Sequence, residues 1–201
     1  MKKINITHNS LLILVFCFSI IFIFGFLEPA GAVTNNTVSE PIQNAKTRVS
    51  KKPFGLKVSP GHSPVSPEKF SGYHTGTDFE VTAAEQNQEV PICAICTGNL
   101  MLKKMATGYG GVIVQSCNLS GQNVTVIYGH LKLSSVTAKV GDKLTAGVKI
   151  GILGQAYSKD TGGERKHLHL GIHKGNSINI LGYVPNKTAL KDWLDVLQFL
   201  K

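Results

Sequence analysis

The chain has 201 residues, of which 42% are hydrophobic and 16% are charged, and its formal net charge is +9 at pH 7. This length fits one domain with appended segments. The composition, which includes 21 glycines, excludes a coiled coil and a disordered tail and is typical of a turn-rich, strand-rich globular protein.

The positive charge favours contact with polyanions, which for an exported protein are wall polymers, lipid headgroups or a charged glycan. Solubility alone explains the charge equally well. The sequence carries no motif typical of DNA or RNA binding, so nucleic acid is not an expected partner.

An almost unbroken apolar run covers residues 11–27, preceded by two lysines near the N-terminus. A basic start, an apolar core and small residues up to Ala32 are typical of an export signal that is cleaved after Ala32. The run also approaches the roughly 20 residues that span a bilayer, so an uncleaved membrane anchor is the alternative. Either segment, over residues 1–32, places the rest of the chain outside the cytoplasm as a secreted, periplasmic or membrane-attached protein.

The next segments predict a linker followed by an irregular entry to the domain. Residues 33–52 are polar and predict a linker. Residues 53–70 contain four prolines and two glycines, which exclude a helix there. We therefore predict a folded domain over residues 53–201. His62, in the proline-rich loop, is expected to be exposed to solvent, with occlusion of a cleft as the alternative.

From residue 72 onward, short strand-like runs alternate with glycine-containing turns. No helix of any length fits between these glycine-separated runs, so we predict a mainly β fold with a largely antiparallel sheet. The expected strands cover residues 77–81, 89–96, 99–106, 111–117, 123–130, 148–153 and 166–173.

The C-terminus has a different pattern. Apolar residues recur there at helical spacing, and they are Leu190, Trp193, Leu194, Leu197 and Leu200. This spacing predicts a C-terminal amphipathic helix, capped by Asn186 or Thr188. Its apolar face is expected to pack on the domain, with a partner-binding helix as the alternative.

Three cysteines follow the apolar N-terminal run, in which Cys17 lies, and an odd count allows at most one internal disulfide. Cys93 and Cys96 form a Cys-x-x-Cys pair, but a second pair for a zinc site is missing, and no helix N-terminus is expected there to lower a thiol pKa. We predict structural roles, with a bridge from Cys117 to either Cys93 or Cys96.

Two segments place histidines where a metal could be bound. His74 and Asp78 are four residues apart, which keeps them on one face of a strand and nearly so on a helix. His167, His169 and His173 alternate along the predicted strand 166–173, and the intervening apolar residues face the core. Several imidazoles on one strand face are unfavourable unless they have partners, so this face is expected to point into a polar cleft.

A third segment ends in His130, at the close of the predicted strand 123–130. Each segment alone is a weak signal, since a lone histidine is more often an ordinary surface residue. Together they supply one carboxylate and four imidazoles in addition to His173. A hydrolytic zinc site needs about three nitrogen or oxygen ligands, an open position and a proton shuttle. The sequence lacks His-Glu-x-x-His, so a histidine would have to transfer the proton.

These motifs, in this order, resemble the lysostaphin-type or LytM-like zinc endopeptidases, which cut peptidoglycan peptides. The resemblance runs from about Pro53 to Trp193. Its motifs are Pro53-Phe54-Gly55, His74-Thr75-Gly76-Thr77-Asp78-Phe79, Gly108-Tyr109-Gly110-Gly111, Tyr128-Gly129-His130-Leu131, the runs 140–147 and 150–154, and His167-Leu168-His169.

The resemblance implies a barrel-sandwich hybrid-like fold, the duplicated hybrid motif, and one Zn²⁺ per chain. It implies zinc ligands at His74, Asp78 and His169. It also implies that His130 and His167 flank the water on the metal and move protons. The implied function is hydrolysis of the peptide cross-links of bacterial peptidoglycan. The role of His173, the bond that is cut, the oligomeric state and the need for an activator stay open.

The chain departs from the family pattern at three places. The family commonly has Thr-Gly-Pro before the paired histidines, and this chain has Gly162-Gly163-Glu164-Arg165-Lys166. Gly171 takes the place of a common glutamate, and residues 80–89 form a longer, polar connection. All three lie near the expected groove, so they are expected to affect substrate choice more than the metal site.

Two other functions fit the same resemblance. One is a catalytically inactive domain of this fold that binds peptidoglycan or activates another hydrolase. Such degenerate relatives usually lose metal ligands, whereas every matched position is present here. The other is a zinc-binding protein without hydrolytic activity, or a protease for a substrate that is not part of the wall.

Overall fold

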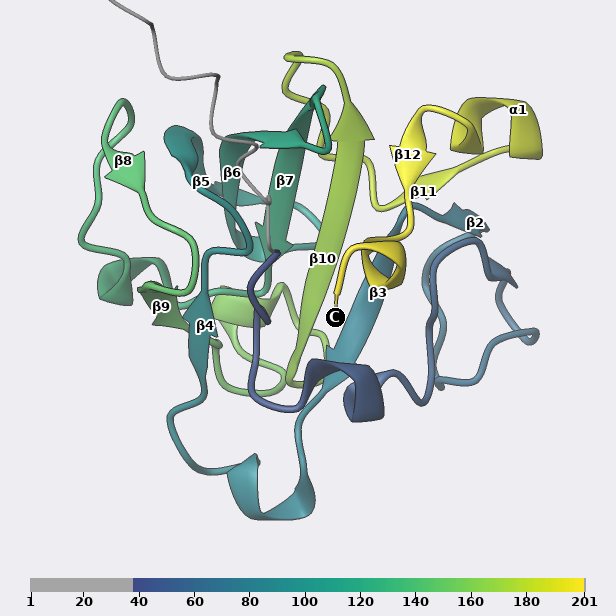
Figure 1. The fold of residues 1–201 in the computed structure, drawn as a ribbon. Coiled ribbons are helices and arrows are strands. Elements are labelled where there is room, and N and C mark those ends of the chain that lie inside the picture. Colours follow the sequence, from purple (N-terminus) through teal and green to yellow (C-terminus); the bar gives the residue numbers. More distant parts are fainter. Residues whose placement is uncertain (1–37, 201) are drawn as a thin grey trace, which may run out of the picture. The chain divides into compact units, whose positions relative to one another are not determined.

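The computed structural model describes residues 38–200 (Figure 1). The predicted export signal or anchor over residues 1–32 lies outside the described residues, as does Cys17. Within residues 38–200, no helix is long and apolar enough to cross a membrane.

Short strands dominate the described residues. The strands are β1 (Lys57–Val58), β2 (Gly72–His74), β3 (Gly76–Glu80), β4 (Pro91–Cys93), β5 (Gly98–Ala106), β6 (Gly110–Leu119), β7 (Gln122–Gly129), β8 (Lys143–Leu144), β9 (Lys149–Ile152), β10 (His167–Lys174), β11 (Tyr183–Val184) and β12 (Trp193–Leu194). The helical turns are η1 (Ala45–Arg48), η2 (Ala83–Glu85), η3 (Leu133–Ser135), η4 (Lys159–Thr161), α1 (Lys187–Leu190) and η5 (Val196–Gln198).

The largest sheet has seven strands in the order β12-β10-β7-β6-β5-β8, with β3 also paired to β10. In Figure 1 its long strands β10, β7 and β6 lie side by side at the centre of the domain. A three-stranded sheet, β1-β2-β11, and the pair β4-β9 complete the strand pairing among the described residues. The named strand pairs are antiparallel, which confirms the predicted mainly β, antiparallel fold.

Local sequence explains the central hairpin. Ser120 and Gly121 connect β6 to β7, with φ angles of 51° and 84°. A two-residue turn with positive φ at both positions matches the twist of the flanking strands. It sets the register in which Leu119 faces Gln122 and Val112 faces Gly129.

The larger of the two hydrophobic clusters among the described residues lies on one face of the large sheet. Leu168, Leu170 and Ile172 of β10 are buried there, together with Phe79 of β3 and Tyr128 of β7. This is the alternation expected of β10, with its apolar residues toward the core and its histidines on the opposite face.

The segment expected to be a linker packs on the domain where it is described. Val38, Ile42 and Ala45 belong to the core cluster, and Val38 forms a parallel bridge with Leu200. Residues from Val38 onward therefore pack on the domain, whereas we predicted the domain to start at residue 53. The apolar residues in this stretch are few, but they occupy spaced positions that can all reach the core.

The C-terminal segment differs from the single amphipathic helix that was predicted. Only α1 is α-helical, and the Asn186 side chain accepts a hydrogen bond from Ala189 N at 2.9 Å as the expected cap. The chain then forms β12, in which Trp193 faces His173 of β10, and ends in the short turn η5. Pairing with β10 satisfies backbone groups and buries Trp193, which explains why the helix does not continue.

The three cysteines among the described residues form one disulfide and leave one free thiol. Cys96 and Cys117 form the disulfide, with Cα atoms 6.1 Å apart. Cys93 is free and half-buried, and burial raises the pKa of its thiol. Of the two pairings that the sequence allowed for Cys117, the structure has the one to Cys96.

Candidate metal centre

Strand register brings the distant motifs together. β3 and β10 pair so that Asp78 lies directly opposite His169, and β7 pairs with the other edge of β10 so that Gly129 also faces His169. Side chains of directly opposed residues lie on the same face of a sheet. His130 follows Gly129 immediately, and His74 ends β2, one residue before β3 begins. Residues about 90 positions apart in the chain therefore meet on one face of the sheet.

Three donor atoms converge at this point. His74 Nε2 lies 3.0 Å from His169 Nδ1 and 3.3 Å from Asp78 Oδ1, and His169 Nδ1 lies 3.1 Å from Asp78 Oδ1. All three residues are buried: His74 is 1% exposed, Asp78 2% and His169 4%. At metal–ligand distances of about 2.0–2.1 Å, tetrahedral geometry separates ligand atoms by about 3.3 Å. The triangle thus fits one small cation with tetrahedral preference, and the residues form a group that could hold a metal.

The second nitrogen of each ligand imidazole has its own partner. His74 Nδ1 lies 3.2 Å from Pro53 O, to which it donates. His169 Nε2 lies 3.2 Å from the Tyr109 hydroxyl, and a proton on Nε2 leaves the lone pair of Nδ1 directed at the other two donors. Metal-binding histidines usually donate their second N–H in this way, which fixes the tautomer and the ring. In this tautomeric state the three converging atoms are all acceptors, so a cation between them relieves their repulsion.

A glycine makes room for the ligand ring. Gly76 lies between the two ligands of its segment, and a Cβ there would sit 2.7 Å from both Cε1 and Nε2 of His169. Any side chain at position 76 would therefore displace the imidazole. This close approach gives a physical reason for glycine in the His74-Thr75-Gly76-Thr77-Asp78 motif.

The surroundings of His169 and Asp78 keep both side chains in the protonation states that can bind a metal. Burial lowers the pKa of His169 to about 4, although the hydrogen bond to Asp78 opposes the shift. Burial acts to raise the pKa of Asp78, but the imidazoles of His167, His74 and His169 outweigh it and hold that pKa well below its usual range. At neutral pH, His169 is therefore a neutral donor and Asp78 an ionised one.

The two sequence-predicted shuttle histidines lie beside the triangle. The rings of His130 and His167 have their centroids 4.3 Å apart. His130 Nδ1 donates to Thr161 O at 3.0 Å, and His167 Nδ1 donates to Arg165 O at 2.9 Å. Both rings are thus oriented by a backbone carbonyl, and Nε2 is the nitrogen left to exchange a proton. His167 Nε2 lies 3.2 Å from Asp78 Oδ2.

His130 has an unusual backbone. Its φ is 65°, in the left-handed region that non-glycine residues rarely adopt. Burial lowers the pKa of its imidazole well below the ordinary value, and the nearby His167 adds to this effect. Strained backbone of this kind gathers at functional sites, and here it turns the imidazole from the end of β7 into the site.

The lowered pKa values predict how the metal-free protein responds to acid. Unfolded histidines titrate near 6.5, whereas folded His169 titrates near 4 and folded His130 well below 6.5. Between those pKa values the unfolded chain binds more protons than the folded chain. The free energy of unfolding therefore has its full value above about pH 6.5 and falls as the pH drops toward 4. We expect the thermal midpoint in excess chelator to decrease across this window. His130→Asn should flatten the decrease, whereas His62→Ala should leave it unchanged, and equal slopes in all three proteins would contradict the prediction.

Two of the three donor residues, Asp78 and His169, line a cavity of about 350 Å³. Its lining also includes His130, His167 and polar, aromatic and aliphatic side chains, among them Tyr109, Glu164, Arg165, Leu181 and Tyr183. The proline-rich loop reaches this cavity through Phe70, whose ring stacks on that of Tyr183 at 5.2 Å between centroids. The cavity therefore gives access to Asp78 and His169 from outside the site.

Sequence reasoning did not assign roles to several lining residues. Tyr109 contacts His169, and its only sequence signal was its place in the glycine-rich Gly108-Tyr109-Gly110-Gly111 motif. Arg165 binds Asp78, and its signal was a positive charge two residues before His167. Lys52 and Tyr183 also line the cavity, with Lys52 Nζ 3.0 Å from the Tyr183 hydroxyl, and the sequence held no pattern that singled them out.

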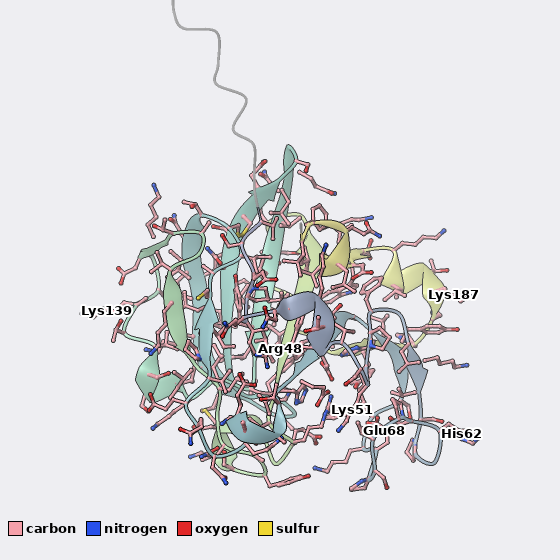
Figure 2. The ribbon with its side chains drawn as sticks, turned by 60° about the horizontal axis from the view of Figure 1, so that its bottom comes forward. Arg48, Lys51, His62, Glu68, Lys139 and Lys187 are labelled. Carbon is pink, nitrogen blue, oxygen red and sulfur yellow. A yellow bond between two sulfur atoms is a disulfide. The ribbon has the colours of Figure 1, made fainter. Side chains whose placement is uncertain are left out.

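Two histidines stay apart from the site. His173 is on β10 but packs edge-on against Trp193, with ring centroids 4.9 Å apart. Trp193 also lies over Gly171, where a Cβ would be 3.3 Å from its ring, so the indole separates His173 from His169. His62 is exposed and lies at the outer edge of its loop in Figure 2, away from Lys51 and Arg48.

Comparison with known proteins gives one family and several solved structures. The family described as peptidase family M23 matches residues 72–180. The structure of LytU is similar, with a TM-score of 0.51 and 23% identity, over 76% of this chain and 83% of that one. A chain of the SpoIIQ-SpoIIIAH pore forming complex has a TM-score of 0.53 and 19% identity, over 83% of this chain and 92% of that one. At these identities the two structures establish a shared fold. A search of curated proteins finds no significant match.

Proposed function

The chain belongs to peptidase family M23, and on that premise we propose that it is a zinc-dependent endopeptidase that hydrolyses peptide cross-links of bacterial peptidoglycan. The observation that carries the proposal is the buried triangle of His74 Nε2, Asp78 Oδ1 and His169 Nδ1 at 3.0–3.3 Å. Two imidazoles and one carboxylate are a donor set that zinc prefers in hydrolytic sites.

We propose that these three residues hold one zinc ion per chain. A site with three protein ligands leaves a coordination position open, which is the arrangement of catalytic rather than structural zinc. Asp78 and His169 also line the cavity, so a zinc ion held by them would lie next to the space where a peptide can enter. When bound, zinc supplies Lewis-acid polarisation of the peptide carbonyl and of the attacking water.

His130 and His167 are proposed to move the protons. Each ring donates Nδ1–H to a backbone carbonyl and keeps Nε2 for exchange, so a neutral imidazole can accept a proton and return it to the departing amine. The lowered pKa of His130 leaves its imidazole neutral at pH 7, so the lone pair on its Nε2 is available to a proton. His167 Nε2 lies 3.2 Å from Asp78 Oδ2, so a proton that it takes up can be held in a hydrogen bond to this carboxylate until the amine leaves.

The wider features of the chain fit a wall substrate. A net charge of +9 attracts anionic wall polymers and concentrates the protein near its substrate. The apolar run over residues 11–27 would deliver the domain outside the cytoplasm, with or without continued attachment to the membrane. The aromatic and apolar lining of the cavity suits the aliphatic portions of a short peptide.

The proposal is tested by the fragments that the purified protein releases from purified peptidoglycan, identified by mass spectrometry. We expect fragments that differ from the intact material by the addition of water across a peptide bond. Chelator should abolish them and added zinc should restore them. If the fragment spectrum is the same with and without chelator, or if no peptide bond is cut, the chain is not a zinc endopeptidase of the wall.

A further inference from the structure

The side chain of Arg165 is in direct contact with a proposed zinc ligand. Its Nη2 donates to Asp78 Oδ2 at 2.8 Å, the oxygen that does not take part in the donor triangle. Its backbone carbonyl accepts the hydrogen bond from His167 Nδ1 at 2.9 Å. One residue therefore touches both a metal ligand, through its side chain, and a proposed proton carrier, through its backbone.

Glu80 holds the guanidinium in this position. Arg165 Nε lies 3.0 Å and 3.1 Å from the two carboxylate oxygens of Glu80, and Nη2 contacts the same carboxylate. The arginine and glutamate side chains are 14% and 13% exposed. A planar guanidinium bound by two oxygens has a defined orientation that a lysine cannot reproduce. The pair is also electrically neutral, so it orients the Asp78 carboxylate without adding net charge to the site.

Backbone contacts fix the two segments that carry this pair. Lys166 Nζ donates to the carbonyls of Glu85 and Gln86 at 3.0 Å and 3.2 Å, and also to that of Gln88. The connection over residues 80–89 is thereby tied to the segment just before the paired histidines. The longer connection and the charged residues before His167 thus contact each other. Both are departures of this sequence from the family pattern.

The contact at Asp78 Oδ2 matters because a carboxylate can bind a metal through one oxygen or through both. His167 Nε2 is also 3.2 Å from Oδ2, but its Nδ1 already donates to a carbonyl, so it can donate to Oδ2 only when the ring is protonated. The guanidinium donates in every protonation state. Arg165 is thus the donor that can contact Oδ2 whether or not His167 is protonated.

We propose that Arg165 is a positioning residue: clamped by Glu80, it occupies Asp78 Oδ2, so that Asp78 offers a single oxygen to the metal and a coordination position stays open. The inference rests on the proposed zinc site. It assigns the unusual residues at 80 and 165 to the metal centre rather than to substrate choice.

The test compares four proteins. They are the unaltered chain, Arg165→Lys, the double variant Arg165→Gln with Glu80→Gln, and Glu85→Gln. The double variant removes the clamp without changing the net charge. Glu85→Gln is the control, because Glu85 forms an equivalent bidentate pair with Arg48 that does not touch Asp78. Each protein is loaded with zinc or with cobalt(II), whose visible absorption weakens as its coordination number rises.

We expect both Arg165 variants to retain metal while the cobalt absorption weakens, because Asp78 then binds through both oxygens. The value of kcat should fall about 10–100-fold, as is typical when a partner of a metal ligand is removed, with KM nearly unchanged. Glu85→Gln should match the unaltered chain in both measurements. The inference is overturned if the Arg165 variants keep the original spectrum, or if Glu85→Gln changes it equally.

The same measurements separate this inference from the proposed function. If the unaltered chain binds cobalt but cuts no peptidoglycan, the proposed substrate is wrong and the spectra alone decide the role of Arg165. If the unaltered chain binds neither metal, both proposals fail.

Discussion

Replacing His169 with alanine is expected to abolish zinc binding and peptidoglycan hydrolysis together. The substitution removes one of three donors from the triangle and leaves His74 Nε2 and Asp78 Oδ1 as an incomplete site. Zinc content should fall from about one ion per chain to near zero, because a closed set of three protein ligands is the minimum for such a site. Loss of Lewis-acid stabilisation, which amounts to several kcal/mol, corresponds to a decrease of about a thousandfold or more in rate. Metal analysis and the clearing of wall suspensions measure the two effects.

His173→Ala is the matched control for this substitution. It removes an imidazole from the same strand, but one that Trp193 separates from the site. We expect it to keep both zinc and activity. His74→Ala should behave as His169→Ala does. Retained zinc in His169→Ala, or wall clearing that survives both the substitution and chelator, would show that the metal is bound elsewhere or is not required.

The alternation along β10 was predictable because it is a property of one strand. Leu168 and Leu170 are apolar and buried, while His167 and His169 lie on the opposite face. The prediction was less complete for His173, which was expected to share that face. The strand does present it there, but Trp193 arrives from the C-terminal segment and covers Gly171 between the two histidines. That contact joins residues 22 positions apart and depends on the pairing of Trp193 with His173, and one sequence does not reveal such a pairing.

The same limit explains the differences at the two ends of the domain. Spacing of leucines predicted a C-terminal helix, but the pairing of Trp193 with His173 interrupts it with a strand. Composition predicted a linker before residue 53, but Val38 and Ile42 are buried in the core. In both places local pattern was outweighed by tertiary contacts, which supply most of the stability of short helices and isolated apolar residues.

The candidate metal ligands could be proposed from the sequence because their residue types and the order of their motifs are visible there, whereas the residues that surround them could not be. Arg165 and Glu80 are 85 positions apart, and they meet only because β3 and β10 pair in the register that sets His167 opposite Glu80. Tyr109 reaches His169 from the connection between β5 and β6. Such partners are defined by which strands pair, and charge or aromatic character alone does not identify them.

A substitution at His130 is the clearest way to separate metal binding from proton transfer. The preferred substitution is His130→Asn rather than alanine, because His130 has a φ of 65° and asparagine tolerates that conformation with less strain. We expect the variant to retain about one zinc ion per chain, because His130 is not part of the donor triangle. Hydrolysis should decrease by about 10²–10⁴-fold, the usual contribution of a general acid or base.

The division of roles follows from comparing His130→Asn with His169→Ala in the same assays. Loss of activity with zinc retained assigns His130 to proton transfer, since the two properties then depend on different residues. The pH dependence of kcat should also change in His130→Asn, because the group that accepts the proton is altered. Equal loss of zinc in the two variants would instead make His130 a metal ligand. The hydrogen bond from its Nδ1 to Thr161 O would then orient a fourth donor, and the site would have no open position for hydrolysis.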